Sequence, residues 1–216
     1  MKISSQLKKQ RVHSKDLIFE LLESGDIFRI FYKDYQLNLL KGNLLDGQVS
    51  NIYLRVKDNK EYQIFPLIGL RAKSAFEVRG NQVIYQGMVL DTTYQVTLTV
   101  LEDRWYYDVW INQSSTFRKF DLVYGQDVGI AHFGSIQSSE AYTAQYIDHA
   151  VYEDENGFKI QSRQNQGDPQ FLQIGSLNKV TGFATDGFQV FGRSFKVDYV
   201  MEGLKKDLEN RKYQYE

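Results

Sequence analysis

The fold class is decided by the alternation in residues 94–112, which read YQVTLTVLEDRWYYDVWIN. Every second position of residues 94–100 is apolar, and the positions between them are Gln95, Thr97 and Thr99. Because successive side chains of a strand point to opposite faces, this pattern predicts a strand with one buried and one solvated face. Residues 105–112 carry bulky side chains on both faces, which predicts an inner strand covered on both sides.

The rest of the chain repeats this pattern between turn signals. Turn groups such as Arg79-Gly80-Asn81 and Glu102-Asp103-Arg104 recur at intervals of about ten residues, as in antiparallel sandwiches. Aromatic residues make up 14% of the chain and proline occurs only 2 times, which favours strands. Further strands are expected at residues 17–22, 27–32, 35–40, 51–56, 145–152, 158–162, 171–174, 179–185 and 188–191. The predicted fold is therefore all-β, a large antiparallel β-sandwich.

Two terminal segments differ from this pattern. Residues 1–15 are polar and are expected to form an arm at the N-terminus. Residues 200–216 switch to helical spacing, with Met201, Leu204 and Leu208 on one side. Such a short amphipathic helix needs a surface to lie on, so we expect a sandwich domain in residues 1–199 and a truncated linker helix in residues 200–216.

Composition argues against several function classes. The formal net charge of −1 gives no reason to expect nucleic acid or a membrane surface as a partner. The absence of cysteine excludes disulfides and thiolate metal sites, and His13, His132 and His149 are not spaced as metal ligands. We therefore expect no metal and no cofactor. The polar start and the absence of a long apolar run predict a soluble, cytoplasmic protein.

The segment that concentrates chemistry is residues 124–166, YGQDVGIAHFGSIQSSEAYTAQYIDHAVYEDENGFKIQSRQNQ. Its glycine spacing matches neither a dinucleotide loop nor a phosphate loop. Residues 139–149 fit a helix or a strand, and the Asn156-Gly157 turn favours a strand for residues 145–152. On a strand, Asp148 and His149 leave opposite faces, so they would not form a local acid–base dyad.

Aromatic and amide side chains in this segment suit carbohydrate, because planar rings stack on sugar faces while amides, arginine and aspartate hydrogen-bond hydroxyl groups. A solvated polar loop network would have a similar composition, and the sequence leaves both interpretations open. The residues are Tyr142, Gln145, Tyr146, Asp148, Arg163, Gln164, Asn165 and Gln166.

Two motifs carry a family resemblance: EAYTAQYIDH in residues 140–149 and SRQNQ in residues 162–166, with weaker matches in residues 42–55 and 183–191. The chain resembles the N-terminal β-sandwich domain of the cellobiose-phosphorylase-like inverting glycoside phosphorylases (glycoside hydrolase family 94). Within that group it is most similar to the 1,2-β-oligoglucan phosphorylases. The resemblance implies a galactose-mutarotase-like sandwich that linker helices join to an (α/α)6 barrel, which supplies the catalytic aspartate and the phosphate site.

The resemblance implies a non-catalytic domain that contributes to carbohydrate binding near the active-site mouth. Its expected partners are a C-terminal (α/α)6 catalytic domain, a β-linked gluco-oligosaccharide and a second copy of the chain. An equally open interpretation is that the motifs pack the sandwich against the barrel. A stand-alone carbohydrate-binding module and a mutarotase-like epimerase that uses His132 or His149 are also compatible with the sequence. The candidate site residues are Tyr142, Gln145, Tyr146, Asp148, Arg163 and Gln164.

Overall fold

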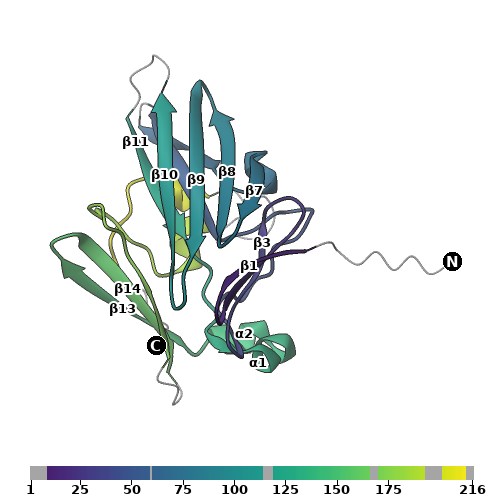
Figure 1. The fold of residues 1–216 in the computed structure, drawn as a ribbon. Coiled ribbons are helices and arrows are strands. Elements are labelled where there is room, and N and C mark those ends of the chain that lie inside the picture. The colour runs from purple at the N-terminus through teal and green to yellow at the C-terminus, as the bar shows by residue number, and fades with distance from the viewer. Residues whose placement is uncertain (1–8, 59, 114–118, 166–169, 193–200, 213–216) are drawn as a thin grey trace.

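Four antiparallel sheets organise the described part of the chain in a computed structural model (Figure 1). The structure describes residues 9–58, 60–113, 119–165, 170–192 and 201–212. The N-terminal sheet has the order β1 (Gln10–Ser14), β2 (Leu17–Leu21), β3 (Ile27–Tyr32), β4 (Tyr35–Gln36) and β12 (Ala131–His132). The outer sheet has the order β10 (Trp105–Gln113), β9 (Thr92–Val100), β8 (Gln82–Val89) and β7 (Ala75–Arg79).

Two smaller sheets and five short helices complete the described fold. The middle sheet has the order β11 (Phe120–Gly125), β5 (Asn51–Asp58) and β6 (Glu61–Pro66), and the C-terminal sheet has the order β13 (Ile147–Asp154), β14 (Gly157–Gln164) and β15 (Phe171–Ile174). The helices are η1 (Leu70–Ala72), α1 (Phe133–Ser138), α2 (Glu140–Ala144), α3 (Gly187–Phe191) and η3 (Glu202–Lys205). The all-β sandwich predicted from the sequence is confirmed.

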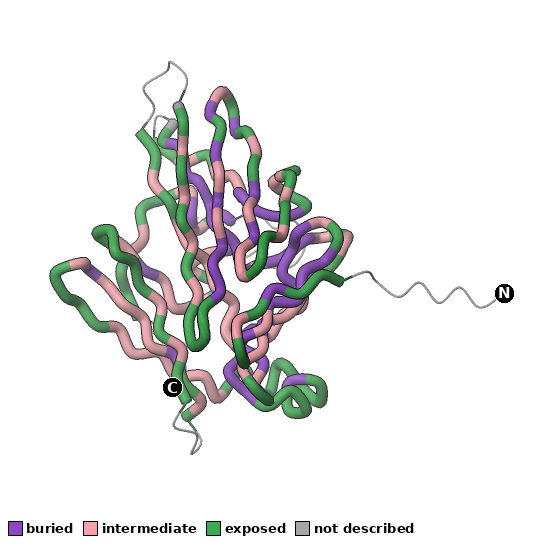
Figure 2. The backbone as a smooth tube through the Cα atoms, viewed as in Figure 1, coloured by how far each residue is buried: buried purple, intermediate pink, exposed green. Residues whose placement is uncertain are grey.

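One main hydrophobic core lies between the outer sheet, the middle sheet and the N-terminal sheet. The alternation that predicted β9 places Tyr94, Val96 and Leu98 in this core, where each is at most 2% exposed. Figure 2 shows buried backbone running along the strands of these sheets and exposed backbone at their turns. Burial of apolar surface at about 25 cal/mol per Å² makes this core the dominant favourable term of folding.

The strand covered on both sides is β5, whereas the sequence predicted β10. Side chains at alternate positions of β5, Ile52, Leu54 and Val56, enter the main core. On its other face, Tyr53 packs in a second cluster with Phe191, Met201 and Leu204. In contrast, β10 is an edge strand of its sheet, and its outward-facing Trp110 is 59% exposed. Bulk on both faces of a strand therefore did not indicate burial on both faces.

Arg55 fastens the C-terminal segment to the middle sheet. Its guanidinium donates two hydrogen bonds of 2.7 Å to the carboxylate of Asp121 on β11. The third nitrogen, Nη1, donates hydrogen bonds to the carbonyl oxygens of Leu204 at 3.0 Å and Lys206 at 2.9 Å. The planar fork of arginine suits such bidentate pairing. The ring of Tyr62 lies 4.2 Å from the guanidinium carbon, so a cation–π contact completes the site.

The C-terminal helix is shorter than predicted, because only η3 is helical within residues 201–212. Residues 193–200 and 213–216 of the expected linker lie outside the described part of the chain. Met201 and Leu204 are buried as the helical spacing required, and Leu208 packs against the same second cluster. The apolar stripe therefore packs against the middle sheet and α3 of this chain.

A strand predicted at residues 188–191 is also wrong, because α3 occupies these positions. The side chain of Asp186 accepts a hydrogen bond from the backbone N–H of Phe188 at 2.7 Å, and Gln189 accepts one from the N–H of Asp186 at 3.2 Å. This capping box starts a helix at Asp186-Gly187, a residue pair that is also typical of a turn. Residues 179–185 form no strand, and only an isolated bridge joins Val180 to Gly157.

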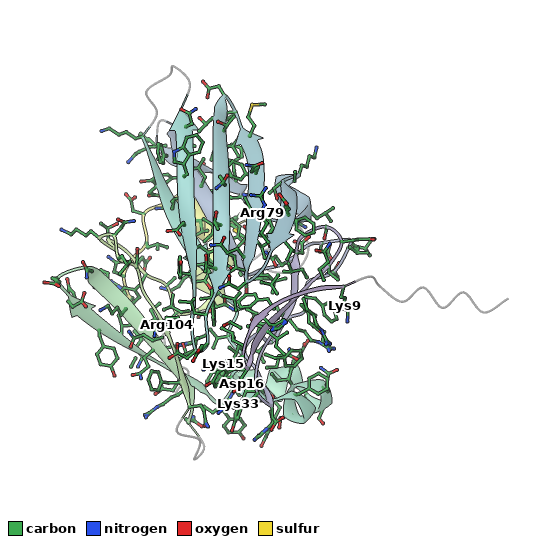
Figure 3. The ribbon with its side chains drawn as sticks, viewed as in Figure 1. Lys9, Lys15, Asp16, Lys33, Arg79 and Arg104 are labelled. Atoms are coloured by element: carbon green, nitrogen blue, oxygen red, sulfur yellow. The ribbon has the colours of Figure 1, made fainter. Side chains whose placement is uncertain are left out.

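Within the polar arm predicted for residues 1–15, residues 10–14 form a strand. Residues 1–8 lie outside the described part, but β1 pairs with β2 along its full length. At the turn between these strands, the Lys15 ammonium lies 2.6 Å from the carboxylate of Glu102, in the turn between β9 and β10. Figure 3 shows Lys15 and Arg104 at this meeting point of the two sheets.

The predicted strand at residues 35–40 is shorter than expected, since β4 contains two residues.

Candidate functional site

A one-turn helix brings two tyrosines together on the surface. The hydroxyl of Ser139 accepts a hydrogen bond from the backbone N–H of Tyr142 at 3.1 Å and so starts α2. Because residues four apart on a helix are neighbours, Tyr142 contacts Tyr146, with ring centroids 4.9 Å apart and an angle of 66° between the rings. Their hydroxyls form a hydrogen bond of 2.8 Å, which raises the pKa of Tyr142. Tyr142 is 59% exposed, so the pair presents ring surface and hydroxyl groups to solvent.

The strand predicted at residues 145–152 begins two residues later, because β13 starts at Ile147. Gln145 and Tyr146 lie in the turn that follows α2. The helical alternative is therefore right for Tyr142, both alternatives are wrong for Gln145 and Tyr146, and the strand prediction is right from Ile147 onward. The side chain of Gln145 is exposed and faces the groove described below.

Asp148 and Arg163 lie opposite each other in the register of β13 and β14, on one face of the C-terminal sheet. The Asp148 carboxylate also lies 3.8 Å from the ammonium of Lys212, which ties the C-terminal segment to this sheet. Both Asp148 and Lys212 are about one-third exposed at their side chains, so the contribution of this pair to stability is small. Arg163 is exposed and remains available for hydrogen bonding to a ligand.

Gln164 leaves the other face of the same sheet, because Gln164 and Asp148 sit on opposite sides of the pleat. Its side-chain amide donates a hydrogen bond of 2.9 Å to the carbonyl oxygen of Gly129. The backbone N–H of the next residue, Asn165, bonds the carbonyl oxygen of Tyr146 at 2.7 Å. These two bonds hold the end of β14 against the loop before β12 and against the end of α2. Gln164 thus positions its neighbours in this structure.

The two histidines of the segment are engaged in packing. His149 lies on the face of β13 opposite to Asp148, as predicted, and its Nδ1 is 2.8 Å from the hydroxyl of Ser162. Burial lowers the pKa of His149, which favours the neutral imidazole. The exposed His132 stacks against Tyr35 with ring centroids 4.4 Å apart. An acid–base dyad between Asp148 and His149 is absent from this geometry.

A broad groove of about 2470 Å³ runs beside these elements. The face of the C-terminal sheet that carries Ile147, His149 and Ile160 forms one wall. The edge strand β10, with residues from both of its faces, forms another. The groove has more than twice the volume of the largest typical small-molecule sites, which range from roughly 300 to 1,000 Å³. Its size suits a chain-like ligand or a segment of polypeptide better than a single small metabolite.

The six predicted site residues do not converge on one point. Gln145 and Asp148 are the two that line the groove among the described residues. Tyr142 and Tyr146 form their own pair beside α2, and Arg163 and Gln164 leave opposite faces of β14. The segment therefore offers a surface with several hydrogen-bonding groups, which differs from an enclosed catalytic pocket.

Residues that sequence reasoning passed over include Trp110 and Arg55. The sequence predicts that both faces of β10 are covered, although on the face of Trp110 the aromatic side chains alternate with the polar Asp108 and Asn112. This alternation was a signal for solvent exposure. An arginine inside the apolar run of β5 was a signal for a buried ion pair. Within the described ranges, no group of three histidine, aspartate or glutamate side chains could hold a metal ion, and no helix is long and apolar enough to cross a membrane.

A family model decides where this chain belongs: the SOGP N-terminal domain matches residues 20–216. The chain belongs to this family. A relative, the 1,2-beta-oligoglucan phosphorylase of Listeria innocua serovar 6a (strain ATCC BAA-680 / CLIP 11262), is 36% identical over 211 residues. This match covers 96% of the chain and 19% of the relative, so the SOGP N-terminal domain spans about a fifth of that protein. The predicted resemblance to the 1,2-β-oligoglucan phosphorylases is confirmed.

Proposed function

We propose that this SOGP N-terminal domain is a non-catalytic sandwich domain of a β-glucan-active glycoside phosphorylase. The observation that carries the proposal is the match to one-fifth of a 1,2-β-oligoglucan phosphorylase over nearly the whole chain. In this proposal, the remainder of the parent protein forms the catalytic (α/α)6 domain, where phosphate cleaves the glucan. Homodimer contacts, membership of glycoside hydrolase family 94 and a cytoplasmic location belong to the same proposal.

The histidine geometry supports a domain without chemistry of its own. General acid–base catalysis needs a base within hydrogen-bond reach of the proton that it moves. His149 bonds Ser162 and faces away from Asp148, and the ring of His132 stacks on Tyr35. A mutarotase-like epimerase would need one of these histidines. Unchanged anomer interconversion in a chain with both histidines replaced by alanine would remove that hypothesis.

The segment around α2 is the proposed contribution to carbohydrate binding. The Tyr142–Tyr146 pair offers ring surface and hydroxyl groups, and Gln145 and Arg163 add donors that are exposed. The half-buried apolar wall of the groove, around Ile147 and Ile160, is the proposed contact with the catalytic domain. Both roles are compatible, because the two surfaces adjoin at the start of β13.

A titration of this chain with linear 1,2-β-gluco-oligosaccharides, followed by calorimetry, tests the binding role. We expect saturable binding, and we expect the Tyr146→Ala variant to bind about 3–10-fold more weakly because an aromatic contact contributes about 0.5–1.5 kcal/mol. Tyr152→Ala is the matched control, since Tyr152 is 54% exposed near the far end of β13. Equal affinity of wild type and Tyr146→Ala would contradict the assignment of this surface.

A further inference from the structure

The outward face of the outer sheet has an unusual composition. Cross-strand register places Trp110, Gln95 and Gln86 in one row and Tyr106, Thr99 and Gln82 in another. The alternate positions of the same strands fill the main core, so these rows face away from it. Trp110 is 59% exposed and Tyr106 is 44% exposed. In Figure 1, these strands lie together as one broad sheet.

Uncharged hydrogen-bonding groups form a ladder across this face. Gln86 donates to Gln95 at 3.0 Å, Gln95 donates to Thr97 at 3.3 Å, and Gln82 donates to Thr99 at 3.0 Å. These contacts preorganise the amide groups, which reduces the entropy lost when a ligand binds.

Charge is confined to three of the outward-facing positions in the described parts of β7–β10. Glu77 and Arg79 form a pair of 2.7 Å on β7, and Figure 3 labels Arg79 there. Asp108 is the third charged residue, and it lies on β10 between the two aromatic side chains. A polyanion would find no basic cluster on β8, β9 or β10. The neutral amides and hydroxyls match a neutral ligand with many hydroxyl groups.

We propose that this face binds a β-linked gluco-oligosaccharide, with Trp110 and Tyr106 as stacking platforms. The two residues are four positions apart on one strand, so their side chains stand roughly 13 Å apart along it. This separation lets two sugar units of one chain stack on different rings, while Gln95, Thr97 and Asp108 bond their hydroxyl groups. The surface is distinct from the Tyr142–Tyr146 pair, because Figure 1 places α2 beside the N-terminal sheet.

The aromatic face is also continuous with the groove. Tyr106, Asp108 and Trp110 line it, together with Gln95 and Thr97. A glucan that lies on the outer sheet therefore extends directly along the groove toward the C-terminal sheet. The inference rests on the proposed function for its ligand class, and it adds a second sugar-binding surface that keeps a polymeric substrate attached to the protein.

Tryptophan fluorescence tests the inference, because the chain contains only 2 tryptophans. Trp105 is half-buried, donates its indole N–H to the Tyr124 hydroxyl at 3.1 Å and packs edge-on against Phe19. Trp105 also lines the groove, so the Trp110→Phe variant is needed to assign a change in emission to Trp110. We expect linear 1,2-β-gluco-oligosaccharides to shift the emission to the blue in a saturable manner, and Trp110→Phe to lose most of the shift.

Calorimetric titrations of variants give the affinity. We expect Trp110→Ala to bind about tenfold more weakly and Tyr106→Ala to bind several-fold more weakly, as loss of a stacking ring requires. Tyr152→Ala is the control for removal of an exposed aromatic ring, and urea midpoints near wild type show that the variants are folded. Tyr146→Ala should leave the fluorescence shift of Trp110 in place.

Three results would overturn the inference. The first is a wild-type chain that binds the glucan without a change in emission, and the second is an affinity that Trp110→Ala leaves unchanged. If Tyr146→Ala weakens binding in either case, the proposed function stands and only the outer-sheet site fails. The third is no glucan binding by the wild-type chain, which rejects both surfaces and leaves a role in interdomain contact.

Discussion

Replacement of Arg55 by alanine removes the side chain that joins the middle sheet to the C-terminal segment. The arginine side chain is 7% exposed, whereas that of Asp121 is 42% exposed. The orphaned carboxylate can therefore regain water, and its pairing contributes only about 1 kcal/mol. The carbonyl oxygens of Leu204 and Lys206 lose charge-assisted hydrogen bonds, each worth about 1.5–3 kcal/mol. We expect a total loss of roughly 4–7 kcal/mol, which is the sum of these three contributions.

Thermal unfolding measures this loss. For a domain of this size, each kcal/mol lowers the midpoint by about 2–4 °C, so Arg55→Ala should unfold roughly 8–28 °C below wild type. Arg55→Lys should lie between the two, because an ammonium keeps the charge but lacks the planar fork. Amide exchange near Leu204 should accelerate in both variants. Arg79→Ala, which breaks an exposed pair with Glu77, is the control and should leave the midpoint in place. An Arg55→Ala midpoint within about 2 °C of wild type would refute the reasoning.

Three further perturbations concern buried groups. Burial raises the pKa of Asp127 to about 7, so the folded state holds more protons than the unfolded state between pH 4 and 7, and stability falls as pH rises through this window. Asp127→Asn should flatten that decline in midpoints measured from pH 4.5 to 7.5. Burial lowers the pKa of His149, so the unfolded state takes up a proton first and stability falls as pH drops below about 6.5. His149→Gln should remove this loss of stability, and His132→Gln is the exposed control. Gly69 has φ of +81°, and a Cβ there would overlap the buried carboxylate of Asp26. Gly69→Ala should therefore lower stability by at least about 2 kcal/mol, whereas Gly80→Ala, at φ of +60° with open space around it, should cost less; equal urea midpoints of the two variants would contradict this interpretation.

Many of the strands could be predicted from the sequence, because the alternation of apolar and polar residues is a local pattern. Strict alternation in residues 94–100 predicted β9 and its buried face, and the Asn-Gly pair predicted the hairpin of β13 and β14. Whether a strand face is buried depends on segments that are distant in the sequence. The bulky side chains on both faces of β10 therefore could not show which face packs against another sheet. The same limit applies to β5, whose second face is covered by residues about 150 positions away in the sequence.

Two wrong predictions of secondary structure concern segments where the sequence also carried the correct pattern, but a competing pattern outweighed it. Asp186 and Gln189 form the spacing of a capping box, but the adjacent Gly187 favoured a turn between strands. In the candidate site, Tyr142 and Tyr146 share one face in a helix and in a strand, so the sequence alone did not decide between them. The Asn-Gly turn favoured a strand that starts two residues too early. Long-range partners such as Lys212, beside Asp148, leave no local pattern and required the structure.

The central claim is that this SOGP N-terminal domain contributes surfaces and no bond chemistry. The most direct test incubates the purified chain with linear 1,2-β-gluco-oligosaccharides and inorganic phosphate, and follows glucose 1-phosphate by ³¹P NMR. The Listeria innocua phosphorylase serves as the positive control for the assay. We expect no glucose 1-phosphate from the chain at any concentration at which it is folded. Sustained release by the chain, in proportion to its concentration, would contradict the account.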